Sequence, residues 1–168
     1  MKKNLPLSLI TLVAAASSQA SVTANCINIR MISGEQLNGN PTTLISADGN
    51  RLSFTGIRST SARYEYSTRL TMFNPLLATG HFRHMEVRIV GRTNRPEIPV
   101  QVWGIRPLGG PEVLATRSMS TVDRRYTTTI VGNVSRFILP GGKMQLHLYA
   151  HSLQPFRHTY DQISVVFY

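Results

Sequence analysis

The stretch TVDRRYTTTIVGNVSRFILPGGKMQLHLYAHS, residues 121–152, decides the fold class of this chain. Apolar side chains alternate with polar or aromatic ones from residue 144 to residue 151. A two-residue period of this kind is typical of a β-strand with one buried face. Residues 140–142 read Pro-Gly-Gly, which favours a chain reversal just before that strand. The stretch therefore predicts sheet scaffold, and it contains almost no acidic side chains.

Similar patterns continue along most of the chain. We expect strands at residues 51–55, 64–73, 83–90, 100–105, 126–131, 144–151 and 162–168. Turn-forming pairs such as Asp48-Gly49 and Asn74-Pro75 stand between them, and a short helical turn is expected at residues 134–137. About seven or eight short strands without crossover helices predict an all-β chain, folded as an antiparallel β-sandwich of jelly-roll type.

The start of the chain has the features of an export signal. Two lysines precede a mainly apolar segment at residues 5–16, which is short for a membrane-spanning helix of about 20 residues. We expect cleavage after Ala20, with cleavage after Ala24 as the alternative. The predicted parts are a signal peptide at residues 1–20 and one β-sandwich domain at residues 25–168. The mature protein is then secreted, periplasmic or extracellular, without a transmembrane helix; a buried N-terminal helix is the alternative.

Cys26 is the only cysteine of the chain, so an internal disulfide is impossible and the fold must depend on its apolar core. We expect its thiol to be buried and unreactive. One alternative is a disulfide with a partner molecule. Another is lipid attachment just after the signal, although Asn25 stands where a small residue would be expected.

The chain is strongly basic, with 18 Lys and Arg against 8 Asp and Glu and a formal net charge of +10. Such a charge favours polyanions, among them acidic polysaccharides, anionic lipids and nucleic acids. The arginines are scattered, however, and the densest pair is Arg124-Arg125. Nucleic-acid-binding proteins more often gather their charge on one helix or stripe. We therefore expect solvated arginines or arginines paired with the few carboxylates, a glycan or other polyanion as partner, and no specific nucleic acid.

Short motifs across most of the chain resemble a family of uncharacterised secreted bacterial β-sandwich modules, jelly rolls of the carbohydrate-binding kind. The matching pieces are residues 47–52, 100–103, 127–129, 131–137, 140–144 and 160–163, together with Asp123. The resemblance implies a jelly-roll fold. It implies nothing about individual ligand residues, because these motifs are turns and strand starts and function is not set by fold.

No pattern of catalytic residues stands out. The chain lacks a G-x-S-x-G elbow, and its acids lie mostly in turns. We expect no cofactor. Calcium is the alternative, with Asp48, Asp123 and Asp161 as the carboxylates that could join such a site. His147 and His151 cannot share one metal on a strand, where they would stand about 13 Å apart.

Exposed aromatic rings with nearby polar groups are typical of small-molecule and sugar sites. The candidate ligand-binding residues are Tyr149, His147, His151 and Trp103. Tyr149 stands between the two histidines on a face expected to point outward, whereas Trp103 lies in a strongly apolar strand and is expected to be buried. The predicted function is a non-catalytic secreted module that binds extracellular or cell-surface glycan. The alternatives are a structural envelope or matrix protein that assembles through its surface, and a small secreted hydrolase.

Overall fold

The computed structural model describes residues 20–59 and 62–168, so the expected signal peptide lies outside the described residues except for Ala20. The described residues form twelve β-strands and three short 3₁₀ helices, without an α-helix. The strands are β1 (Val22–Ser33), β2 (Glu35–Asn38), β3 (Leu52–Thr55), β4 (Ile57–Arg58), β5 (Tyr64–Phe73), β6 (His84–Thr93), β7 (Val100–Arg106), β8 (Gly110–Arg117), β9 (Arg124–Val131), β10 (Ile138–Leu139), β11 (Lys143–Ser152) and β12 (Arg157–Phe167). The 3₁₀ helices are η1 (Pro41–Leu44), η2 (Pro75–Ala78) and η3 (Val134–Phe137).

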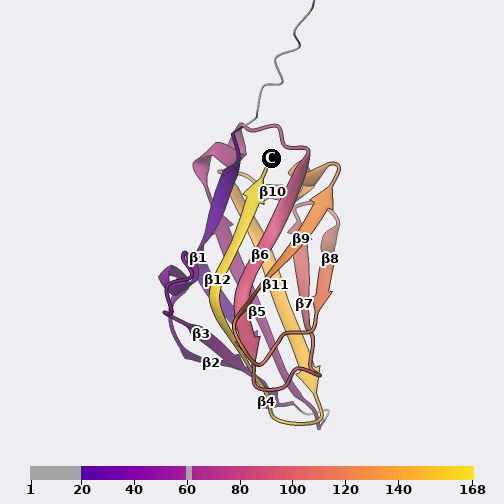
Figure 1. Ribbon diagram of the computed structural model, residues 1–168. Helices are drawn as coiled ribbons and strands as arrows, with labels where there is room; N and C mark the ends of the chain where they lie inside the picture. The colour runs from indigo at the N-terminus through magenta and orange to yellow at the C-terminus, as the bar shows by residue number, and fades with distance from the viewer. Residues whose placement is uncertain (1–19, 60–61) are drawn as a thin grey trace, which may run out of the picture.

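The strands form two sheets that pack face to face, with β12 and β6 lying in front of β5 and β11 in Figure 1. The first sheet has the order β2-β3-β12-β6-β9, and the second has the order β1-β5-β11-β7-β8. Strand β1 belongs to both, because its first residues pair with β12 and the rest pair with β5. All registered strand pairs are antiparallel. The prediction of an all-β, antiparallel jelly-roll sandwich is confirmed.

The core lies between the two sheets and is built from alternate residues. On β11 the apolar positions of the alternating pattern are at most 1% exposed, as at Leu146 and Leu148. They face apolar side chains of the other sheet, such as Val165 and Phe167, in one continuous cluster. Each large apolar side chain buried in this way stabilises the fold by about 1.5–3 kcal/mol. Cys26 belongs to the same cluster, and its burial raises the pKa of the thiol to about 11, as expected for an unreactive cysteine.

A series of hydrogen-bonded polar side chains crosses one end of the core. The Tyr66 hydroxyl lies 2.7 Å from the Tyr160 hydroxyl and 2.8 Å from Nδ1 of His158, whose Nε2 lies 3.1 Å from the Ile98 carbonyl oxygen. Because a carbonyl can only accept, Nε2 carries the hydrogen, and Tyr66 donates to Nδ1. Burial lowers the pKa of His158 to about 4, so the ring is neutral in the folded protein.

The structure adds strands that the sequence pattern did not predict. Strands β1 and β8 were missed, as were the short strands β2, β4 and β10. In β1 the pairing with β5 shifts register twice, which breaks the two-residue alternation. Strand β8 begins at Gly110 and Pro111, which read as a turn. It is an edge strand, and an edge strand tolerates proline where the backbone nitrogen faces solvent, because no hydrogen bond to a neighbouring strand is lost there.

Candidate ligand-binding face

The second sheet turns one face toward the core and the other toward solvent. Pairing across its five strands lines up two rows of side chains on this outer face. The Trp103 row is Val113, Trp103, His147, Arg69 and Arg30, from β8 to β1. The Tyr149 row, directly beside it, is Thr116, Gln101, Tyr149, Ser67 and Ser33. The two rows together are called the outer face below.

A hollow of about 280 Å³ lies where the two rows cross β7, β11 and β5. It is lined by Ser67, Gln101, Trp103, Pro111, His147 and Tyr149. It is slightly smaller than typical small-molecule sites, which begin at about 300 Å³. A smaller hollow of about 60 Å³ shares Gln101 and Tyr149 with it and extends to His151. The structure thus brings together the four residues proposed from the sequence as ligand-binding, while their binding role stays a prediction.

The burial of Trp103 differs from expectation. It was expected to be buried, but it is half-buried on the outer face, because Val102 and Gly104 occupy the inward positions of β7. A side chain at position 104 would collide with the Phe137 ring, so this inward position has room only for glycine. The sequence of β7 is apolar on both faces, and composition alone therefore did not show which face Trp103 occupies.

His147 connects the two rows. Its Nε2 lies 2.6 Å from the Ser67 hydroxyl, which is itself largely buried. Burial, and then the positive charge of Arg69, lower the pKa of His147, so the ring is neutral at neutral pH. A neutral imidazole beside a hydroxyl offers both a donor and an acceptor to a ligand. The neighbouring Tyr149 ring stands 5.5 Å, centroid to centroid, from the ring of His151.

The outer face also holds polar atoms that are enclosed but unbonded. Among the described residues, Trp103 Nε1, Arg69 Nε and Ser33 Oγ are shielded from solvent and have no hydrogen-bond partner. A buried donor without a partner costs about 1–3 kcal/mol. These atoms are three of the six such side-chain atoms among the described residues.

The described arginines are of two kinds. Some pair with carboxylates, for example Arg51 with Asp123 at 2.6 Å and Arg136 with Glu112 at 2.9 Å, whereas others, such as Arg92 and Arg157 on the first sheet, do not. Within the described part of the chain, neither Arg69 nor Arg30 forms an ion pair.

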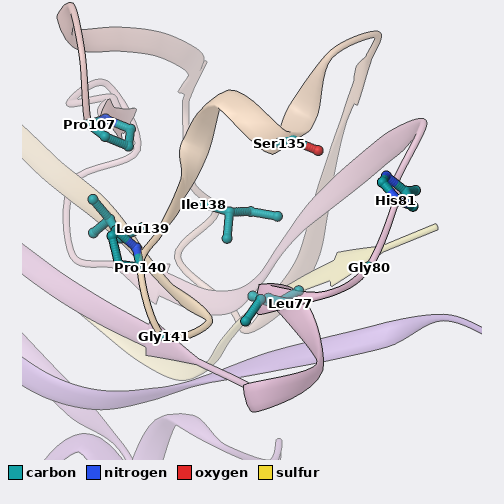
Figure 2. Close-up of a pocket in the computed structure, with 10 residues that line it drawn as sticks. Leu77, Gly80, His81, Pro107, Ser135, Ile138, Leu139, Pro140 and Gly141 are labelled. Carbon is teal, nitrogen blue, oxygen red and sulfur yellow. The ribbon is translucent and has the colours of Figure 1, made fainter.

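Two other hollows are larger but lack an exposed pair of aromatic rings. One, of about 520 Å³, lies at an end of the sandwich, and Figure 2 shows Leu77 and Ile138 around it. Its lining is mainly apolar side chains, prolines and glycines, with only His81 and Ser135 contributing polar side chains. The other, of about 340 Å³, lies on the first sheet and includes the exposed Arg92 and Arg157 but no aromatic ring.

The three candidate calcium carboxylates do not form a cluster. Asp161 accepts the Gly49 N–H at 2.9 Å, Asp48 accepts the Asn50 N–H at 3.0 Å, and Asp123 binds Arg51. Over residues 20–59 and 62–168, no three His, Cys, Asp or Glu side chains stand close enough together to hold one metal ion. Calcium binding remains an untested prediction that this arrangement does not favour.

Comparisons with known proteins agree with the fold. No family model matches the chain, and no curated protein sequence matches it. Among solved structures, a CBM4 carbohydrate-binding module is similar at 10% identity and a TM-score of 0.50, over 88% of this chain and 94% of that one. The N-terminal cellulose-binding domain of Cellulomonas fimi β-1,4-glucanase C is similar at 11% identity and a TM-score of 0.51, over 82% and 87% of the two chains. At this identity the likeness shows the fold: a β-sandwich like that of carbohydrate-binding modules.

Proposed function

We propose that this protein is an exported, non-catalytic module that binds a glycan chain on the outer face of its second sheet. The observation that carries the proposal is the hollow in which Trp103 and Tyr149 stand beside His147, Gln101 and Ser67. The cellulose-binding domain of similar fold supports it. Export is proposed from the charged and apolar start of the chain at residues 1–20.

The side chains of the hollow suit a sugar. An aromatic ring buries the apolar C–H face of a sugar ring, and a few placed polar groups then select its hydroxyls. Trp103 and Tyr149 supply the rings, and Gln101, Ser67 and His147 supply donors and acceptors. Gln101 and Tyr149 also line the second, smaller hollow next to His151.

The direct test is affinity electrophoresis and calorimetry of the mature protein with a panel of neutral and acidic polysaccharides. We expect at least one glycan to bind, and Trp103→Ala to weaken that binding at least tenfold, which corresponds to about 1.4 kcal/mol. Leu108→Ala is the matched control, because Leu108 is 92% exposed and lies outside the hollow. Absence of binding across the panel, or equal binding by Trp103→Ala, would contradict the proposal.

A small hydrolase is the second candidate, and the 2.6 Å contact between Ser67 Oγ and His147 Nε2 is the observation that favours it. A serine nucleophile needs a base that accepts its proton, and a neutral histidine can do so. Arg69 opposes this role, since it destabilises the imidazolium that forms on proton transfer, whereas a catalytic carboxylate would stabilise it. Turnover of ester substrates that disappears in Ser67→Ala would establish the hydrolase; no turnover in either protein would exclude it for those substrates.

A further inference from the structure

Building on the proposed glycan binding, we infer that the ligand is an acidic glycan and that Arg69 binds one of its anionic groups. The first reason is the position of Arg69. It lies in the middle of β5, with His147 opposite it on one side and Arg30 opposite it on the other. It is half-buried, its Nε is enclosed without a partner, and no described carboxylate neutralises it.

The second reason is the cost of this arrangement to the free protein. Like charges directly opposite each other on neighbouring strands destabilise a sheet, and Arg30 faces Arg69 in this way. Arg69 also lowers the pKa of His147, although burial contributes more. The acid on the same face of β5, Glu65, is bound by Arg63 at 3.3 Å. An anion placed beside Arg69 would relieve this repulsion.

The third reason is the distance between the aromatic ring and the charge. Trp103 and Arg69 are two strands apart in the Trp103 row, a separation of about 10 Å. One sugar unit packed on Trp103 would therefore place another unit of the same chain, farther along, at Arg69. The planar guanidinium can bind a carboxylate or a sulfate through two parallel hydrogen bonds. The site thus fits a chain that carries both apolar ring faces and anions.

The test compares an oligogalacturonide with its methyl ester, which keeps the sugar chain but removes the charge. By calorimetry at low salt, we expect the wild-type protein to bind the acid at least tenfold more tightly than the ester. Arg69→Gln should lower affinity for the acid at least tenfold and leave the ester within about twofold. Arg92→Gln on the first sheet removes the same charge from an exposed site and should change neither the affinity for the acid nor that for the ester. A parallel pair, dextran sulfate against dextran, shows whether sulfate serves as well as carboxylate.

Arg69→Lys is the conservative control variant. The melting temperature of every variant is compared with that of the wild type, so that a folding defect is recognised. The lysine variant should keep part of the preference for the acid, since it keeps the charge but loses the paired hydrogen bonds. Equal binding of the charged and uncharged chains of both pairs would overturn the inference while leaving glycan binding intact. So would an equal loss in Arg92→Gln, which would show unspecific attraction. Failure of every glycan to bind would instead overturn the proposed function, and this inference with it.

Discussion

Acid should destabilise this protein through His158. The pKa of this buried ring is about 4 in the folded protein, against an ordinary value of 6.5, and the cause is burial. The unfolded chain therefore takes up a proton first as pH falls, so the stability from a neutral His158 is complete above pH 6.5 and is lost between pH 6.5 and pH 4. A difference of about 2.5 units at 1.36 kcal/mol per unit corresponds to about 3 kcal/mol. That is a large part of the 5–15 kcal/mol typical of a folded domain.

Urea unfolding at pH 7.5 and pH 4.5, followed by circular dichroism, measures this loss. We expect the free energy of unfolding of the wild type to fall by about 2.5 kcal/mol more than that of His158→Gln over the same interval, because glutamine does not titrate. Other titrating groups, including His147, are present in both proteins and cancel in the comparison. If the two proteins lose the same free energy on acidification, the burial argument for His158 is wrong.

Three further outcomes follow from the packing. Gly34→Ala should destabilise the fold by at least about 2 kcal/mol in urea unfolding, because φ is +84° there and a Cβ would overlap the side chain of Tyr66; an unchanged midpoint would contradict this. Cys26 should react with a thiol reagent only as fast as the protein unfolds, because it is 1% exposed; rapid labelling of the native protein would be inconsistent with the core described. A chain that begins at Asn25 should have a free energy of unfolding about 1–2 kcal/mol lower than one that begins at Ser21, because it lacks residues 22–24, which pair with β12; equal stability would refute the importance of those pairs.

The parts of the fold that could be predicted are those with an uninterrupted alternation. The strand expected at residues 64–73 coincides with β5, and the helical turn at residues 134–137 coincides with η3. Strand β12 was expected to begin at residue 162 but begins at Arg157, because a register shift at Asp161 divides the alternation in two. Local pattern is sufficient where one face is continuously buried, and it fails where a bulge changes which face a residue occupies.

The candidate site was predicted in part for the same reason. The alternation on β11 is clear, so Tyr149, His147 and His151 could be placed together on an outward face. Arg69 was missed because it belongs to a strand distant in sequence, and only the order β5-β11-β7 brings it beside His147. Strand order depends on long-range packing, which a single sequence does not display. Strand β7 carries apolar residues on both faces, so its sequence did not show which way Trp103 points.

Trp103 is the only tryptophan of the chain, so its fluorescence reports directly on the outer face. The most direct test of the account is a fluorescence titration of the wild-type protein with the oligogalacturonide at low salt. A saturable change in the Trp103 emission, with the same dissociation constant as in calorimetry, is the expected result. Binding seen by calorimetry without any change in that emission would place the ligand elsewhere on the molecule and contradict the account.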